Sequence, residues 1–297
     1  MKNILLTFFS LISTISMFAQ NANTFEVAVK KTNTYLSVYS QVQPYHFEIS
    51  LNEYTLPKED ILALHKEYNI TNDSIDTIDT YEFLGYLQDK IIHHLVTAIN
   101  QPEFNTAKIE NLFHSNLGIL ISDDGLLYNF MLDEKTGGSY RSYLSFVYYK
   151  PLTTELKVTA EQLRNKELPP PYSAFSGDGF TAIKKMTSAT NEVQYIAEGY
   201  VKGCGTCFIT YVSLITLRNA NFETDFSYAV ETRLNVADIS YSNHLNTITI
   251  TYDTSDLTPD CYCTEEESHK DYNPENSSKK CICIFNYSNG NFKPSNF

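Results

Sequence analysis

The six cysteines are the residues whose type and spacing most directly suggest chemistry. They fall into one C-x-x-C pair and two C-x-C pairs: Cys204 and Cys207, Cys261 and Cys263, and Cys281 and Cys283. Sulfurs at such spacings can bind a soft metal as thiolates, exchange electrons as a redox pair, or cross-link a fold as disulfides. Which use applies depends on the compartment and on the elements that carry the sulfurs.

The N-terminus predicts export. Lys2 is followed by an apolar run that ends near the small residue Ala19, which is the layout of a secretory signal peptide. No later run approaches the roughly 20 apolar residues that a membrane-spanning helix needs. We therefore predict a signal peptide over residues 1–19 with cleavage near Ala19. The mature chain is expected in the periplasm or outside the cell, with no transmembrane segment.

An even number of cysteines in an exported chain favours disulfides. Residues i and i+2 of a strand lie on one face about 6–7 Å apart, at the limit of disulfide reach and with poorly aimed Cβ atoms. Bonds within a C-x-C pair are therefore unfavourable, whereas two antiparallel C-x-C strands would place each sulfur opposite a partner. Together with closure across the turn KGCGTC, this predicts three bonds: Cys204–Cys207, Cys261–Cys283 and Cys263–Cys281.

Two other uses of the sulfurs stay open. A redox C-x-x-C begins a helix whose N-terminus lowers the thiol pKa, but FITYVSLITL after Cys207 is rich in β-branched residues and favours a strand. Thiolates could instead hold zinc or copper(I), although six exceed the four ligands of one zinc ion. The ligands of that alternative would come from the same set: Cys204, Cys207, Cys261, Cys263, Cys281 and Cys283. Export disfavours free thiols, so we expect no metal and no other cofactor.

Local signatures of catalysis are missing from the sequence. Ser176–Gly179 lacks the first glycine of a G-x-S-x-G elbow, and no phosphate-binding loop or dinucleotide fingerprint occurs. His93 and His94 are adjacent, without the i, i+4 pair of an H-E-x-x-H zinc site. The other histidines are scattered: His46, His65, His114, His244 and His269. Catalytic residues therefore stay unidentified, and we lean toward a protein that is not an enzyme.

The chain is acidic, with a formal net charge of −13. Nucleic acids are bound chiefly by Lys and Arg side chains that meet phosphates, and this chain has no basic run, so nucleic acid is excluded as a partner. The acidic loop between the two C-x-C pairs lacks the ordered ligand spacing of a calcium loop. We expect that loop to be solvated at the surface.

The first part of the chain has helical periodicity. In Thr80–Ile99 one apolar stripe recurs at steps of three or four residues: Leu84, Leu87, Ile91 and Leu95. Residues 59–68 follow Pro57 and predict a second helix, and residues 102–114, with Pro102 in the first turn, predict a third.

From Leu117 onward the pattern changes to that of strands. Asp124-Gly125 lies between GILIS and LLYNFML and predicts a hairpin, and residues 139–149 predict a further strand. After Phe180 most segments alternate and are joined by turn-like sequences. Helices followed by antiparallel strands predict the α+β class. We expect a mainly helical segment over residues 20–116 and a β-rich region over residues 117–297, forming one continuous domain.

The segment ISDDGLLYNFMLDEKTGGSYR, Ile121–Arg141, resembles a segment of uncharacterised secreted proteins of the Bacteroidetes type. In those proteins a helix precedes a strand pair of the form S-x-DG-x-L-x-x-F, followed by T-x-x-GG. The segments TAIKKMTSATNEVQYIAEGYV and IFNYSNGNF are similar to their hairpins. The resemblance covers residues 105–297 and implies export and this architecture, with turn roles for Gly and Asp. It implies no activity.

These observations favour an exported, non-enzymatic binding or envelope-associated protein. The abundant Tyr and Phe residues on predicted strands could supply contact area for a protein or glycan partner, although most such rings belong to a core. Two alternatives stay open: a secreted hydrolase whose acid and base come from separate loops, and a thiolate metal-binding protein.

Overall fold

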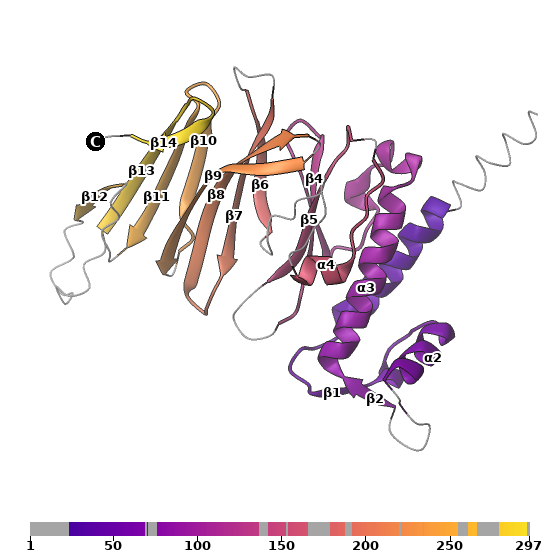
Figure 1. Cartoon of the computed structure of the whole chain (residues 1–297). Helices are drawn as coiled ribbons and strands as arrows, with labels where there is room; N and C mark the ends of the chain where they lie inside the picture. Colours follow the sequence, from indigo (N-terminus) through magenta and orange to yellow (C-terminus); the bar gives the residue numbers. More distant parts are fainter. Residues whose placement is uncertain are drawn as a thin grey trace, which may run out of the picture. The chain divides into compact units, whose positions relative to one another are not determined.

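The structure is a computed structural model that describes residues 24–68, 70, 76–136, 142–152, 154–165, 179–187, 192–219, 221–233, 235–254, 261–265 and 279–295. The expected signal peptide, residues 1–19, and most of the acidic loop, residues 266–278, lie outside this part of the chain. The described residues divide into two compact units. The helical unit lies within Met1–Leu117 and Thr153–Glu167, and the sheet unit lies within Gly118–Leu152 and Leu168–Phe297. The predicted α+β class is confirmed (Figure 1).

The helical unit begins with a helix over residues 24–41, called the N-terminal helix below. The elements that follow in chain order are β1 (Glu48–Ser50), η1 (Leu51–Glu53), α2 (Lys58–Glu67), β2 (Thr77–Asp79), α3 (Thr80–Ile99), η2 (Pro102–Asn105), η3 (Ile109–Asn111) and α4 (Ala160–Asn165). Strands β1 and β2 pair antiparallel. Among the described residues, no helix combines the length and apolarity needed to cross a bilayer.

Helix α3 has the bounds that the hydrophobic spacing predicts. Asp79 precedes it and accepts hydrogen bonds at Oδ1 from the backbone N–H groups of Tyr81 and Glu82, at 2.8 and 3.1 Å. These bonds satisfy two of the donors that every helix start leaves free. The predicted apolar stripe is buried throughout: Leu84, Leu87, Ile91 and Leu95. Local periodicity and capping therefore suffice to specify this helix.

The predicted helix over residues 102–114 is wrong, because the structure has two separate 3-10 turns there, η2 and η3. Phe104 and Ile109 are both buried. On a continuous α-helix, residues five apart would point about 140° away from each other. Two turns with a break between them allow both side chains to be buried.

Two side chains, those of Asn100 and Arg164, attach residues 154–165 to α3. Asn100, at the end of α3, donates from Nδ2 to the Leu156 carbonyl at 2.9 Å and accepts at Oδ1 from the Leu156 N–H at 2.8 Å. Arg164 of α4 donates to Gln88 and Asp89 of α3, each at 3.1 Å. The chain thus returns to the helical unit after β5, and the sequence pattern alone does not predict that return.

Within its described residues the sheet unit contains three antiparallel sheets. The first is β3 (Leu117–Ile121), β4 (Leu127–Asp133) and β5 (Tyr143–Tyr149). The second, in spatial order, is β6 (Phe180–Met186), β7 (Val193–Lys202), β8 (Cys207–Arg218) and β9 (Asn221–Arg233). The third has the order β10 (Asp238–Ser242), β11 (Thr247–Thr254), β13 (Lys279–Ser288) and β12 (Tyr262–Glu265), with β14 (Asn291–Pro294) also pairing with β13.

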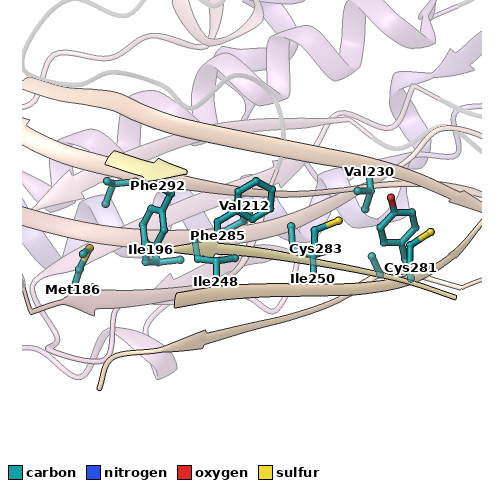
Figure 2. Close-up of a cluster of buried hydrophobic side chains, with 13 residues drawn as sticks. Met186, Ile196, Val212, Val230, Ile248, Ile250, Cys281, Cys283, Phe285 and Phe292 are labelled. Atoms are coloured by element: carbon teal, nitrogen blue, oxygen red, sulfur yellow. The ribbon is translucent and has the colours of Figure 1, made fainter. Parts of the chain in front are cut away.

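The second and third sheets pack face to face over an apolar core (Figure 2). Ile196, Val212 and Val230 come from the second sheet, and they meet a layer from the third that includes Ile250 and Phe285. The strands of both sheets alternate, so every second residue enters this core.

The opposite face of the second sheet packs against the first sheet. Tyr195 and Ile215 are fully buried there beside Leu127 and Val147. The second sheet therefore has a core on each face, which explains why Gln194–Gly199 of β7 and Val212–Thr216 of β8 are continuously buried.

The predicted turn at Asp124-Gly125 is present, and Gly125 has the positive φ, 71°, that such a turn requires. Asp124 accepts hydrogen bonds from Ser122 at 2.6 Å and from the Tyr195 hydroxyl at 3.0 Å, and Lys185 Nζ lies 3.0 Å away. Burial alone would raise the pKa of Asp124, but these donors hold it below its usual value. The turn is thus fastened to the second sheet through a carboxylate.

Candidate functional site

The two C-x-C pairs face each other as predicted: Cys263 lies in β12 and Cys261 directly before it, opposite Cys281 and Cys283 of β13. Disulfides join Cys261 to Cys283 and Cys263 to Cys281. Cys281 and Cys283 are fully buried and point into the core between the second and third sheets. Because i and i+2 share a strand face, both bonds lie on the core side of the sheet and attach its short edge strand β12 to β13.

The third disulfide joins Cys204 and Cys207 in the hairpin between β7 and β8. The backbone N–H of Cys207 also donates to Cys204 Sγ at 2.9 Å, and β8 begins at Cys207. A strand follows the C-x-x-C motif here, whereas the redox hypothesis requires a helix whose N-terminus lowers the pKa of the first thiol. None of the six cysteines is free, so in this state no thiolate is present to coordinate a metal.

Asp60 of α2 is a buried carboxylate at the centre of the helical unit. It is 3 % exposed and accepts hydrogen bonds from the hydroxyls of Tyr35 and Tyr86, each at 2.6 Å. Lys90 Nζ lies 3.0 Å from the same carboxylate. Burial would raise the pKa of Asp60, but these donors outweigh it and hold the pKa below its usual value. The cluster joins the N-terminal helix, α2 and α3, and its contacts give it a structural role.

His94 lies beside this cluster. Its ring stacks on Tyr35, with centroids 5.6 Å apart and planes 7° apart. Burial lowers the pKa of His94 to about 4, assisted by the nearby positive groups His93, Lys31 and Lys90. The imidazole is therefore neutral at physiological pH and packs as an aromatic ring.

His65 of α2 forms a pair with Asp76, with Nε2 2.5 Å from Oδ1. Both side chains are about one-fifth exposed, at 19 % and 22 %. A His–carboxylate pair can act as the base of a hydrolase when a hydroxyl or thiol binds the other ring nitrogen. In the part of the chain that the structure describes, no such nucleophile is hydrogen-bonded to His65. The pair fixes α2 to the start of β2.

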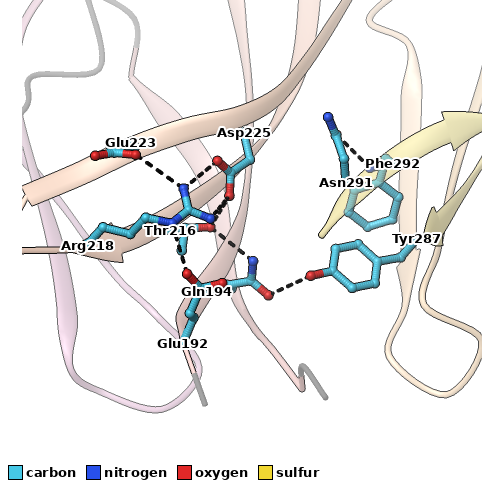
Figure 3. A network of polar contacts seen from close by, with 9 residues as sticks. All are labelled: Glu192, Gln194, Thr216, Arg218, Glu223, Asp225, Tyr287, Asn291 and Phe292. Carbon is cyan, nitrogen blue, oxygen red and sulfur yellow. Dashed lines mark hydrogen bonds and ion pairs between the residues drawn. The ribbon is translucent and has the colours of Figure 1, made fainter. Parts of the chain in front are cut away.

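Arg218, at the end of β8, is surrounded by three acids (Figure 3). Its Nε donates to Glu192 at 2.9 Å, and its Nη1 donates to Glu223 at 3.2 Å. Asp225 accepts from Nη1 and Nη2 at 2.6 and 2.7 Å, and this bidentate contact lowers the pKa of Asp225. A guanidinium with its donors engaged in this way is a structural clamp, with little capacity left for an anionic ligand.

The same network reaches the third sheet. Thr216 donates to Asp225 at 2.6 Å and accepts from Gln194 Nε2 at 3.0 Å. The Tyr287 hydroxyl of β13 donates to Gln194 Oε1 at 3.1 Å (Figure 3). This chain of hydrogen bonds satisfies the buried amide of Gln194, which would otherwise be costly between two apolar sheet faces.

An open groove of about 720 Å³ runs along the N-terminal helix. Its lining from that helix consists of Phe25, Glu26, Val29, Lys30, Asn33, Thr34, Ser37, Val38 and Gln41, and Thr55 and Leu112 complete it. The helix positions recur at steps of three and four residues, so they lie along one side of the helix. The groove therefore follows the helix axis and has the form of an elongated trough.

Asn33 fixes one wall of the groove. Its Nδ2 donates to the Leu112 carbonyl at 2.8 Å, and its Oδ1 accepts from the His114 N–H at 2.8 Å. The segment that follows η3 is thus attached to the N-terminal helix through one side chain. This wall is set before any ligand binds, which reduces the entropy lost on binding.

The groove lining combines apolar side chains with hydroxyl and amide groups, one carboxylate and one ammonium group. The lining contains no histidine or cysteine. Among the described residues, no three His, Cys, Asp or Glu side chains are grouped so as to hold a metal ion. Apolar side chains next to a few polar groups are typical of the lining of ligand-binding pockets.

The groove is not evident from the sequence, because its residues look like an ordinary polar helix face. The spacing of Glu26, Lys30, Asn33, Ser37 and Gln41 marks one side of a helix. No nearby sequence feature indicates that Thr55 and Leu112 lie next to this side of the N-terminal helix. No protein-family model, curated protein or solved structure matches the chain.

Proposed function

We propose that the protein is an exported, non-enzymatic binding protein that holds an elongated, partly apolar ligand in the groove of the helical unit. The observation that carries this proposal is the groove itself, whose wall is fixed by Asn33 and whose lining offers apolar contacts next to hydroxyl and amide groups. Such a mixture suits a ligand with a hydrocarbon portion and a few polar groups.

Export is part of the same proposal. Disulfides persist in oxidising compartments, and all six cysteines are paired here. This pairing supports a signal peptide over residues 1–19 and a periplasmic or extracellular location. The proposal also includes the resemblance to secreted proteins of the Bacteroidetes type, which likewise implies export.

The two alternatives have weaker support. A hydrolase would need a nucleophile or activated water beside a base, and the His65–Asp76 pair has no bound hydroxyl or thiol among the described residues. A thiolate metal site would need reduced cysteines, and reduction would release the edge strand β12 from its two covalent attachments. We therefore favour binding over both.

Tryptophan fluorescence tests the proposal directly, because the chain has no tryptophan of its own. Ser37→Trp places a single reporter in the groove lining, and Val27→Trp places the same reporter at an exposed position of the same helix outside the lining. Dodecanoate serves as the partly apolar probe and maltotriose as a polar probe.

We expect dodecanoate to change the emission of S37W saturably, without effect on V27W, and maltotriose to change neither. The proposal fails if dodecanoate leaves S37W unchanged or alters both variants alike, because the groove would then not be the binding site. A response of S37W to maltotriose alone would overturn the assignment of an apolar ligand.

A further inference from the structure

We propose that a second surface of the helical unit binds a Lys- or Arg-bearing segment of another protein. This surface, called the acidic aromatic surface below, consists of Tyr45, Phe47, Glu48, Asp79, Tyr81 and Glu82. Glu48 and Asp79 belong to the β1–β2 pair, which is labelled in Figure 1, and the other four residues flank that pair in the chain. The surface shares no residue with the groove lining. The inference therefore does not depend on the groove having a ligand.

Three aromatic rings of this surface are exposed. The exposed fractions are 89 % for Phe47, 69 % for Tyr45 and 54 % for Tyr81. Scattered exposed apolar residues are ordinary, but several that lie close together are typical of interaction sites. Aromatic residues are also enriched among the residues that dominate binding energy at protein interfaces.

The backbone brings these residues together. Strands β1 and β2 pair antiparallel, with Glu48 opposite Asp79. One residue further on, the Phe47 carbonyl accepts a hydrogen bond from the Thr80 N–H at 3.0 Å. Phe47 takes part in this hydrogen bond and Tyr81 directly follows Thr80. The bond therefore brings Phe47 and Tyr81 close together, although they are far apart in sequence.

The surroundings of these rings are acidic. Residues 42–57 and 76–89 contain no Lys or Arg, and their carboxylates are Glu48, Glu53, Asp76, Asp79, Glu82 and Asp89. Asp76 pairs with His65 and Asp89 pairs with Arg164. Glu48 and Glu82 form no ion pair with any side chain in the described part of the chain.

Glu48 and Asp79 also oppose each other directly across the strand pair, an arrangement of like charges that is unfavourable in a sheet. Asp79 is held in place because it caps α3. A cation placed between the two carboxylates would relieve their repulsion, so the local charges favour a positively charged occupant.

Lys and Arg side chains match both features of the surface. Their charged ends can pair with Glu48 and Glu82 and can lie over aromatic faces, while their alkyl stems cover the rings. A neutral or acidic segment would gain only the apolar contact. The occupant we infer is an extended segment of a partner protein that carries several such cations.

The test uses the mature chain and a short fluorescein-labelled peptide that alternates Lys and Gly, with Gln–Gly and Glu–Gly peptides as references. Fluorescence anisotropy is measured for wild type, Phe47→Ala, Tyr81→Ala and Glu48→Lys. Glu231→Lys is the matched control for charge, because Glu231 is an exposed residue of β9 in the sheet unit. Tyr262→Ala is the control for an exposed ring, because Tyr262 is 54 % exposed.

We expect preferential binding of the Lys peptide, weakened about threefold to tenfold by F47A or Y81A. Binding should fall by more than about tenfold in E48K. Y262A should leave the Kd unchanged, and E231K should weaken binding much less than E48K. Equal weakening by E48K and E231K, with no effect of F47A or Y81A, would show diffuse attraction to an acidic protein and overturn the proposal. Equal affinity for the Lys and Gln peptides would overturn it as well.

Because the substituted side chains are exposed, the variants should keep the wild-type thermal unfolding midpoint. A variant with a changed midpoint is replaced by the milder change at the same position, Phe47→Leu or Glu48→Gln. The proposal then requires F47L or E48Q to weaken binding of the Lys peptide.

Discussion

Cys263 lies directly opposite Cys281 in the register of β12 and β13, with Cα atoms 4.1 Å apart. This separation is typical of a non-hydrogen-bonded pair in an antiparallel sheet, where facing side chains are closest. Cys261 and Cys283 repeat the arrangement two residues along, with Cα atoms 4.3 Å apart. Two covalent bonds therefore hold an edge strand of only four residues, Tyr262–Glu265, whose backbone pairing alone would be weak.

The two nested disulfides should not contribute additively to stability. Their sequence separations are 22 and 18, so either bond alone already closes most of the same loop. Replacing one pair by alanines should lower the free energy of unfolding by less than about 2 kcal/mol, whereas replacing both pairs should cost about 3–4 kcal/mol. Urea unfolding of the two double variants and the quadruple variant measures this difference.

The control for this prediction is Cys204→Ala with Cys207→Ala. That bond has a sequence separation of only 3, so its loss should cost no more than about 1–2 kcal/mol. If the two nested bonds instead cost the same amount independently, their contribution comes from packing in the core rather than from loop closure.

Removing the Asp60 carboxylate should destabilise the helical unit strongly. Asp60→Ala leaves two buried hydroxyls without an acceptor and removes the partner of Lys90. We expect a loss of about 3–4 kcal/mol in the free energy of unfolding. Chemical denaturation followed by far-UV circular dichroism, which reports chiefly on the helices, measures it.

Asp89→Ala is the matched control, because Asp89 pairs with Arg164 at the surface and its side chain is 57 % exposed. Exposed pairs contribute roughly 0–1 kcal/mol. Similar losses in D60A and D89A would contradict the central role of the buried cluster.

Acid should destabilise the helical unit in two stages. The pKa of His94 is about 4 in the folded protein, below its usual value of 6.5. Between these pH values the unfolded state binds more protons, so stability is fully present above pH 6.5 and falls as the pH drops toward 4. The effect should reach about 1–3 kcal/mol for a partly buried group. Asp60, whose pKa is lowered, adds a further loss at still lower pH.

His94→Phe tests this assignment, because it keeps a ring against Tyr35 and removes the titration. The slope of stability against pH between 6.5 and 4 should flatten in H94F and remain in His244→Phe, since His244 is exposed in the sheet unit. A wild-type slope in H94F would assign the pH dependence to other groups.

Two glycines should respond in opposite directions to the same substitution. A Cβ at Gly85, in the second turn of α3, would meet no heavy atom within 4 Å. Gly85→Ala should therefore raise the free energy of unfolding by about 0.5–1 kcal/mol, because alanine is the better helix former. A Cβ at Gly199 would lie 2.7 Å from the Gly179 carbonyl oxygen and would also clash with the Tyr211 ring.

Gly199→Ala should accordingly cost about 2 kcal/mol or more, since backbone must move to make room. Thermal unfolding of the two variants beside wild type distinguishes them. A destabilised G85A would mean that the helix has a close neighbour at this position. A neutral G199A would mean that the Gly179 backbone and the Tyr211 ring can move aside without penalty.

The sequence by itself determined the features that depend on neighbouring residues. The period of its apolar residues and the cap at Asp79 specify α3. The need for a positive φ places the turn at Gly125. The i, i+2 spacing of the C-x-C pairs makes bonds within a pair unfavourable, which leaves the cross-strand pairing of Cys263 with Cys281. Each of these features follows from local geometry, so the sequence of one segment or of one pair of segments is enough to predict it.

Only the tertiary structure decided the features that require contacts between distant segments. Phe104 and Ile109 are both buried, and the segment that carries them forms two 3-10 turns, although its sequence pattern predicts one helix. Asp60 meets Tyr35 and Tyr86 only after three helices pack together. Burial and hydrogen bonding of such groups are set by residues far away in sequence, and no local pattern encodes which of them will meet.

The two proposed binding surfaces also depend on contacts between distant segments. The groove requires Leu112 to lie beside the N-terminal helix, a contact made through Asn33 across 79 positions. The acidic aromatic surface requires Phe47 to meet Thr80 across the β1–β2 pair. The sequence supplied the side chains, and long-range packing with backbone pairing decided which of them share a surface.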